Sequence, residues 1–448
     1  MRRLTLAFAA CTAVALATTA GAANSTGPTY ASYVLPTTIS ASAGEPSVGV
    51  NWKTGAVFLQ AGLSTAKASF DSANTPTWSD VTDLREALIT LDAVAATDNA
   101  TGRLFVSQLV GFSSILSFTD DDGQTWSSSQ GSGAPAGADH QTVGAGPYPA
   151  EGVAGPLTTY PNAVYYCSQS IATALCARSD TGGLTFGPGL PTYTVSDCSG
   201  LHGHVRVSPD GTVYLPNKNC GGHQSVVVSR DAGTTWAVRP IPGSTNSLSD
   251  PSVAAGKDGT AYVSWVNANG TIHAAVSGDK GSSWSHDVDL GEQVGVVNAT
   301  IPSTIAGDGD RAAVAFLGTK TEGKGQDQYF GQDETHKQYV GAEQHLYVAT
   351  TYNRGKTWKT VDVTPKDAVQ RGRVCLGGTG CTGGDRNLLD FLDIGVDRQG
   401  RVVVGWADGC TGTCLSSDHV ASNPHTAVPM LSRQTKGQGL FASPPKVL

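Results

Sequence analysis

The chain has 448 residues, of which 55 are glycine and 22 are proline. These two residues interrupt regular backbone so often that we expect no long helices. Charged residues make up 15% of the chain, against about 25% in an average globular protein, whereas 39% of the residues are hydrophobic. This composition excludes a disordered chain, and the net charge of -8 argues against nucleic-acid binding through a net basic surface.

Residues 1–23 have the pattern of a secretory signal peptide. Arg2 and Arg3 form the charged start, residues 4–17 an apolar segment, and residues 20–22 a small-residue cleavage site. No later run of about 18 apolar residues occurs, so we expect no membrane-spanning segment. We therefore predict a secreted, extracellular protein whose mature chain begins directly after this segment.

Eight cysteines follow the signal segment, an even number, and they stand in local couples. Export to an oxidising compartment makes disulfides the first interpretation. No Cys-x-x-Cys spacing is present, which argues against a zinc site. The couples are Cys167 with Cys176, Cys198 with Cys220, Cys375 with Cys381, and Cys410 with Cys414; the pairing among the last four stays open.

A short sequence of the form Ser-x-Asp-x-Gly-x-Thr-Trp recurs along the chain. An aspartate can accept hydrogen bonds from turn N–H groups, glycine supplies a positive φ, and the aromatic side chain can pack beneath the next strand. We therefore interpret each copy as a hairpin turn. Good copies lie at residues 119–126, 229–236, 277–284 and 351–358, a weaker one at 179–186, and degenerate ones at 69–78 and 432–441.

A second element, an apolar strand followed by a turn and a strand with an aromatic residue, recurs upstream of these turns. Seven starts are found, near Glu45, Asp92, Gln141, His204, Asp250, Ser303 and Leu392. Four short strands in each unit of about 50 residues are typical of a β-propeller blade. We predict an all-β protein in which residues 44–448 form a single β-propeller of seven four-stranded antiparallel blades, with six blades as the alternative. An extended leader is expected at residues 24–43.

Extra length is concentrated in residues 144–160, 319–339 and 369–387. Insertions in repeat proteins usually lie on one face, and binding occurs there. We therefore expect these three segments to share a face.

The repeated turn sequence, with its copies at 229–236 and 277–284, resembles the Asp-box, or bacterial neuraminidase (BNR) repeat, of the sialidase superfamily. The resemblance extends over nearly the whole mature chain and implies a β-propeller. It also implies an exo-α-sialidase-like glycoside hydrolase acting on terminal linkages of acidic glycans. Asp-boxes in that family are structural turns away from the active site. Where the family usually has Arg-Ile-Pro, at the first inner strand, this chain has Glu45-Pro46-Ser47, so we carry over no family catalytic residue by position.

The loops that lead into the innermost strands of a propeller surround its central funnel on one face, so their residues converge in space. Ionisable side chains dominate these positions. Glycoside hydrolysis requires one protonated and one ionised carboxyl group, and histidine can act as an acid or base near neutral pH or as a metal ligand. The alternative is that the acids cap strand starts and the histidines bond nearby carbonyls. The candidate catalytic residues are Glu45, Asp139, His140, His202, His204, Asp250 and Asp390.

Arg85, Arg371 and Arg386 are the candidate substrate-binding residues. A guanidinium group can bind a carboxylate through two parallel hydrogen bonds, which would suit an acidic sugar. The alternative role for Arg386 is to brace its own loop through Asp385 or Asp390.

Two other functions stay open at this stage. The first is a uronate polysaccharide lyase that uses histidine and a tyrosine, and the second is a non-catalytic propeller that binds a glycan or a protein. We expect a glycan or polysaccharide substrate, no nucleic-acid or membrane partner, and a monomer. We expect no cofactor, with a structural calcium ion as an option. The tyrosines considered for the lyase are Tyr148, Tyr160, Tyr165 and Tyr166.

Overall fold

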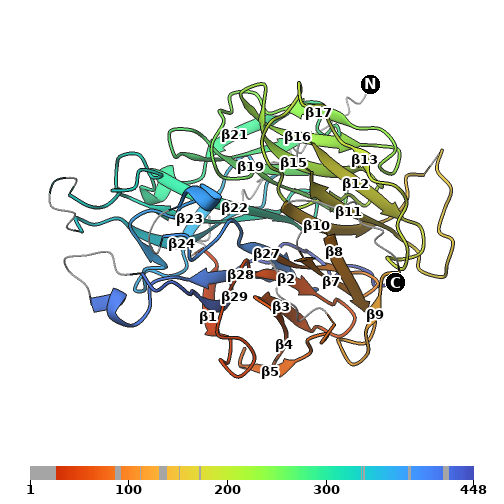
Figure 1. Cartoon of the computed structure of the whole chain (residues 1–448), viewed down its shortest axis with the longest axis horizontal. Coiled ribbons are helices and arrows are strands. Elements are labelled where there is room, and N and C mark those ends of the chain that lie inside the picture. The colour runs from red at the N-terminus through yellow and green to blue at the C-terminus, as the bar shows by residue number, and fades with distance from the viewer. Residues whose placement is uncertain are drawn as a thin grey trace, which may run out of the picture.

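The computed structural model describes residues 27–85, 92–110, 113–130, 139–150, 152–170, 173–333, 335, 339–381, 385–416 and 423–448. The predicted signal peptide lies outside these residues. Seven antiparallel sheets are arranged around one axis as a β-propeller (Figure 1). The predicted all-β fold with seven four-stranded blades is therefore confirmed, and the six-bladed alternative is wrong.

In the first six blades the strands follow chain order outward from the axis. The first blade consists of β2 (Ser47–Val50), β3 (Val57–Ala61), β4 (Ser64–Phe70) and β5 (Pro76–Asp80), and the second of β6 (Ala93–Asp98), β7 (Arg103–Val110), β8 (Ser113–Thr119) and β9 (Ser127–Ser128). The third consists of β10 (Asp139–Gly146), β11 (Ala163–Gln169), β12 (Ala174–Ser179) and β13 (Leu190–Pro191), and the fourth of β14 (Arg206–Val207), β15 (Val213–Cys220), β16 (His223–Ser229) and β17 (Ala237–Pro240).

The fifth blade consists of β18 (Ser252–Ala255), β19 (Ala261–Val266), β20 (Ile272–Ser277) and β21 (Ser285–Asp289). The sixth consists of β22 (Asn298–Ala306), β23 (Ala312–Thr319), β24 (Glu343–Thr351) and β25 (Lys359–Asp362), with the short β26 (Gln370–Arg371) added to β24. Three short 3₁₀ helices are present in the described residues: η1 (Glu292–Val294), η2 (Gly378–Gly380) and η3 (Gly412–Ser416). No helix of the described part of the chain is long and apolar enough to cross a membrane.

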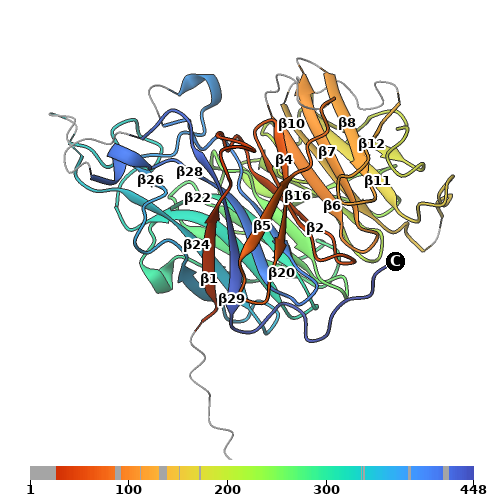
Figure 2. The same ribbon diagram turned by 90° about the horizontal axis from the view of Figure 1, so that it is seen from below.

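The seventh blade joins the two ends of the chain. Its inner strands are β27 (Asp393–Val396), β28 (Val402–Asp408) and β29 (Val428–Lys436), and its outer strand is β1 (Thr29–Val34), which lies within the segment expected as a leader. β1 is antiparallel to β29, with Val34 opposite Met430 and Ser32 opposite Ser432 (Figure 2). The N-terminal strand thus closes the ring.

Six copies of the repeated turn sequence lie in the turn between the third and fourth strands of a blade, whereas the degenerate copy at 432–441 begins inside β29 and forms no such hairpin, because the fourth strand of its blade is β1. In one copy, Ser229 Oγ accepts a hydrogen bond from the Gly233 N–H at 2.8 Å. The Asp231 carboxylate accepts bonds from the Thr235 N–H at 2.8 Å and hydroxyl at 2.6 Å. The same two bonds surround Asp279. The interpretation of this sequence as a hairpin turn is therefore confirmed for six copies and wrong for the copy at 432–441.

The hydrophobic core lies between neighbouring blades. Val57 and Leu59 of the first blade, for example, belong to one buried cluster with Val403 and Leu431 of the seventh. Such packing between sheet faces excludes water from every inner strand and is the main stabilising contribution to the fold. It also fixes the loops at the strand ends.

All seven inner strands begin at the same face of the ring, which we call the top face, and end at the bottom face. The insertions at 319–339 and 369–387 lie in top-face connections, after β23 and after β25. The insertion at 144–160 follows inner strand β10 and therefore lies at the bottom face. The expectation that all three share one face is wrong for this insertion, because it connects the first and second strands of its blade.

Four disulfides join the predicted couples and settle the pairing that the sequence left open. They connect Cys167 with Cys176, Cys198 with Cys220, Cys375 with Cys381, and Cys410 with Cys414. These bonds are consistent with the expected extracellular location.

Candidate functional site

His140 is the centre of a buried charge cluster at the top face. Its side chain is 3% exposed, its Nε2 atom lies 3.0 Å from Oδ2 of Asp250, and its Nδ1 atom lies 3.0 Å from Oδ1 of Asp139. The register of β10 is interrupted between Asp139 and Thr142, and His140 has a positive φ of 53°. This β-bulge takes His140 out of the regular ladder and is typical of functional positions.

The charges in this cluster alternate. Burial opposes ionisation of Asp250, but Lys218, whose Nζ lies 3.1 Å from Oδ1, and His140 outweigh it and hold the pKa of Asp250 well below its usual value. Burial alone would lower the pKa of His140. The charge of Asp250 and the hydrogen bond to Asp139 outweigh this effect and raise the pKa of His140 well above its usual value. His140 is therefore an imidazolium at neutral pH.

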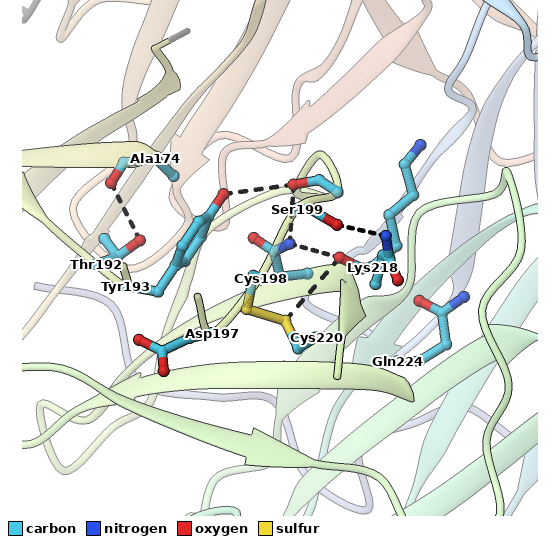
Figure 3. Close-up of a disulfide and its surroundings, with 12 residues drawn as sticks. Ala174, Thr192, Tyr193, Asp197, Cys198, Ser199, Lys218, Cys220 and Gln224 are labelled. Carbon is cyan, nitrogen blue, oxygen red and sulfur yellow. Dashed lines mark hydrogen bonds between the residues drawn. A yellow bond between two sulfur atoms is a disulfide. The ribbon is translucent and has the colours of Figure 1, made fainter. Parts of the chain in front are cut away.

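The Cys198–Cys220 disulfide lies beside Lys218 at the end of β15. Figure 3 shows the disulfide beside Lys218, whose backbone carbonyl lies 3.9 Å from the Cys220 sulfur. Asn217 donates hydrogen bonds to the carbonyls of Lys218 at 2.8 Å and of Gly200 at 3.1 Å. These contacts tie the loop before the fourth inner strand to β15, and so hold Lys218 opposite Asp250.

His202 packs beside His140 and, unlike it, is uncharged. It is fully buried, its Nδ1 atom lies 3.0 Å from the Gly203 carbonyl, and its ring centroid is 6.1 Å from that of His140. Burial, reinforced by the charge of His140, lowers the pKa of His202 to about 4. His202 is therefore neutral at physiological pH.

Glu45 and Asp92 form a second group with the opposite electrostatic character. Burial, followed by the charges of Asp92 and Asp390, raises the pKa of Glu45 well above its usual value. Burial, followed by the charge of Asp139, raises the pKa of Asp92 to about 6. Glu45 Oε1 also accepts a hydrogen bond from the Asp390 backbone N–H at 3.0 Å. These two carboxyl groups can thus hold protons close to neutral pH.

A small cleft brings the two groups together. The space that the centre of a water molecule can occupy in this cleft is about 10 Å³. The cleft therefore has room for about one water molecule. The ring of Phe391 forms part of its wall: the ring centroid lies 5.1 Å from that of His140 and 4.7 Å from that of His204, on which it stacks. The polar residues that line the cleft are Glu45, Ser47, Asp92, His140, Gln141 and His204.

Asp393 forms the floor of this region. Its carboxylate accepts hydrogen bonds from Arg206 and from the Val48 N–H, both at 3.0 Å, and lies 3.8 Å from Nδ1 of His204. Asp393 and Arg206 also line the central channel beneath, a cavity of about 380 Å³ with mostly apolar walls. The floor therefore separates the polar cleft from the channel.

The structure brings all seven candidate catalytic residues into one cluster. Each lines the cleft or touches a residue that does: Glu45, His140 and His204 line it, Asp139 and Asp250 bind His140, Asp390 binds Glu45, and His202 packs beside His140. Their proximity is as expected, and their catalytic roles stay predictions.

The candidate arginines are each engaged by a carboxylate. Arg386 binds Asp390 through both terminal nitrogens and so borders the cluster. The other two lie outside the cleft. Arg85 binds Asp83 at 2.8 Å with half of its side chain exposed, and Arg371 binds Glu343 at 3.2 Å on the sixth blade.

The tyrosines considered for a lyase lie elsewhere. Tyr165 and Tyr166 are fully buried between blades. Tyr148 donates a hydrogen bond to Asp180 at 2.9 Å, and Tyr160 donates one to Asp98 at 2.6 Å. Among the described residues, none that lines the cleft is a tyrosine.

Sequence reasoning missed Asp92, Lys218, Gln141 and Phe391 as candidates. Asp92 and Gln141 had a usable signal, because each stands at the start of an inner strand. Lys218 lies near the end of a second strand, and Phe391 follows a candidate acid; neither position has a distinguishing pattern. In the part of the chain that the structure describes, no group of three or more His, Cys, Asp or Glu side chains is arranged to hold a metal ion.

No protein-family model matches the chain, and no curated protein matches its sequence. Solved structures do match. YCF48 bound to a D1 peptide is 10% identical with a TM-score of 0.50, over 91% of this chain and 95% of that chain. A streptogramin B lyase is 10% identical with a TM-score of 0.48, over 90% and 96%. The Hadza microbial sialidase Hz136 is 14% identical with a TM-score of 0.39, over 88% and 65%. At these identities the similarity concerns the fold alone.

Proposed function

We propose that the protein is a secreted carbohydrate-active enzyme that hydrolyses a terminal glycosidic bond at the top-face cleft by general acid–base catalysis. The observation that carries this proposal is the separation of carboxyl pKa values within one cluster. The pKa of Asp92 is raised to about 6, whereas that of Asp139 is held below its usual value. Glycoside hydrolysis needs one carboxylic acid and one carboxylate, and such a separation assigns the two roles.

Asp92 is the proposed general acid. Its pKa of about 6 leaves roughly a tenth of the molecules protonated at pH 7. Burial and the charge of Asp139 are what raise this pKa. Asp92 would protonate the leaving-group oxygen as the glycosidic bond breaks, while a water molecule that gives its proton to the Asp139 carboxylate forms the new bond to the anomeric carbon.

Asp139 is the proposed carboxylate. Burial raises its pKa, but the hydrogen bond from His140 outweighs burial and keeps it ionised. Its side chain is 46% exposed, so a substrate or a water molecule can reach it. His140 acts as a positioning residue, because it is itself held between Asp139 and Asp250.

The arginine pairings favour a neutral terminal sugar over an acidic one. An acidic sugar needs a guanidinium that is available to its carboxylate, and Arg85, Arg371 and Arg386 each bind a carboxylate of the chain. Exo-sialidase activity is therefore the second candidate substrate specificity, and a His/Tyr lyase finds less support because the tyrosines lie outside the cleft.

The experiment is a hydrolysis screen of the purified mature protein. The panel contains neutral terminal glycosides, sialosides and uronate polysaccharides, with released reducing sugar and near-ultraviolet absorbance as parallel readouts. We expect reducing sugar from a neutral glycoside. Free sialic acid would restore the acidic specificity, ultraviolet absorbance would indicate β-elimination, and binding without any product would indicate a non-catalytic propeller.

A further inference from the structure

We propose that Phe391 is a gate that closes the top-face cleft in the free protein and that a sugar ring must displace. The inference rests on the proposed function only in naming the ligand as a sugar. With Phe391 in place the cleft has room for about one water molecule, far less than a sugar ring needs. Because Glu45, Asp92 and His140 all line this cleft, no substrate reaches them while the gate is closed.

The ring of Phe391 contacts both histidines that line the cleft. It stacks on the His204 imidazole at 28° between planes and meets the His140 imidazole edge to face. Stacking on a neighbouring ring is favourable but modest, at about 0.5–1.5 kcal/mol beyond area burial. A sugar ring that forms hydrogen bonds with the carboxyl groups beneath can therefore replace it.

The backbone next to Phe391 restricts where movement can occur. Leu388 and Leu392 are buried, and the Asn387 amide donates hydrogen bonds to the carbonyls of Gly409 and Pro424. Residues 389–391 between these anchors are only partly buried. The gate is therefore a three-residue segment between two fixed points.

Two features make this segment ready to move. Leu389 has a φ of 56°, in the left-handed region that disfavours a branched aliphatic residue. The Asp390 N–H binds the carboxyl of Glu45, a residue of the cleft itself. A substrate hydroxyl that binds Glu45 competes with this hydrogen bond, so substrate binding and gate opening are coupled through one group.

The test is chemical labelling of His204 with diethyl pyrocarbonate, which acylates accessible, unprotonated imidazoles, with the label mapped by mass spectrometry. The exposed His286 serves as the internal reference. Phe391→Ala removes the ring and should increase the His204 labelling rate about tenfold relative to that of His286. A tenfold increase corresponds to a free energy of about 1.4 kcal/mol for opening of the cleft in the wild type. The matched control Phe186→Ala removes a ring at the bottom face and should leave the His204 rate unchanged.

A second variant tests whether residues 389–391 move as a gate or stay in place as a fixed wall of the cleft. Asparagine tolerates a positive φ better than leucine, so Leu389→Asn should stabilise the closed segment and slow His204 labelling. A fixed wall predicts no change. Equal His204 rates in the wild type and in Phe391→Ala, or an unchanged rate in Leu389→Asn, would overturn the gate. Phe391→Leu, which retains apolar volume, covers the case in which the alanine variant does not fold.

Labelling requires no substrate, so the gate and the proposed function fail independently. If the hydrolysis screen yields no product while Phe391→Ala exposes His204, the gate stands and the proposed function is wrong. If hydrolysis occurs and the His204 rate is the same in all variants, the gate alone is wrong. If both hold, Phe391→Ala should lower KM, because the fraction of protein with an open cleft rises.

Discussion

His140 and Asp250 are 110 residues apart in the sequence, yet Nε2 of the histidine lies 3.0 Å from Oδ2 of the aspartate in a nearly water-free environment. His140 belongs to the third blade, and Asp250 directly precedes the inner strand of the fifth. Lys218 of the fourth blade binds the other oxygen of Asp250. One carboxylate thus connects three blades at the top face.

Asp250→Asn should destabilise the protein strongly. The substitution leaves Lys218 without its carboxylate and removes one of the two anions that hold the charge of His140. Loss of one partner from a buried ion pair typically costs about 3–5 kcal/mol. Denaturant unfolding monitored by tryptophan fluorescence measures the change. Asp308→Asn, which breaks the more exposed pair with Lys257, is the control and should cost at most about 1 kcal/mol.

The same cluster predicts how stability changes with pH. The pKa of His140 is raised on folding, so its stabilising contribution is complete below the usual histidine pKa and is lost as pH rises through the raised value. The pKa of Asp250 is lowered, so its contribution is present at neutral pH and is lost in acid. In Asp250→Asn both dependences should weaken. An unchanged pH profile of unfolding would mean that the pair does not share its charge as described.

Asp92→Asn should increase stability while it sharply lowers activity on glycosides whose leaving group needs a proton. Between the usual pKa of 3.8 and the folded value of about 6 the native state binds more protons, so stability falls as pH rises through this window. Above pH 6 the wild type carries the full cost of a buried carboxylate, about 1–3 kcal/mol, which asparagine avoids. Thermal unfolding at neutral pH tests the gain in stability, and the glycoside assay tests the loss of activity.

Asp408→Asn is the matched control for this pair of effects. Burial raises the pKa of Asp408 to about 7, and the residue lies in the seventh blade away from the cleft. Its carboxylate accepts a hydrogen bond from the Cys410 N–H, which an asparagine oxygen can also accept. Above its raised pKa the buried carboxylate destabilises the native state, and asparagine avoids this cost. Asp408→Asn should therefore raise the free energy of unfolding by about 1–3 kcal/mol above pH 7, with activity unchanged. If it loses activity as Asp92→Asn does, the assignment of Asp92 as the acid fails.

The Cys198–Cys220 disulfide should matter for the site more than for the fold. Its loop of 22 residues implies a stability loss of about 2–4 kcal/mol when both cysteines become serine. Because the loop carries His202 and braces Lys218, we also expect a lower pKa for His140, measured by NMR titration. The Cys375–Cys381 disulfide closes a loop of only 6 residues. Replacing both of these cysteines by serine should leave the His140 titration unchanged.

The fold could be predicted from the sequence because its signals are local. The hydrogen bonds of each turn lie within seven residues, as around Asp231, so the repeat pattern reports the structure directly. Strand β1 lacks such a signal. Its partner β29 lies about 400 residues away, and residues 29–34 were therefore expected to belong to a leader.

The site could be predicted only in part for the same reason. Glu45 and Asp250 precede Pro-Ser at inner-strand starts, so their place on the ring followed from the repeat. Which residues touch depends on the closed ring: Lys218 reaches Asp250 from another blade, and Phe391 reaches both histidines across the axis. No local pattern encodes these contacts. The pairing of Arg386 with Asp390, only four residues away, is by contrast the alternative that the sequence offered.

The most direct test of the central claim compares leaving groups in Asp92→Asn. A general acid matters when the leaving group needs a proton and hardly matters when it is a good leaving group such as a dinitrophenolate. On the substrate class found by the screen, Asp92→Asn should lose about 100-fold or more in kcat with an alkyl leaving group and little with dinitrophenyl. Equal losses on both substrates, or full activity of Asp92→Asn on the alkyl glycoside, would contradict the account.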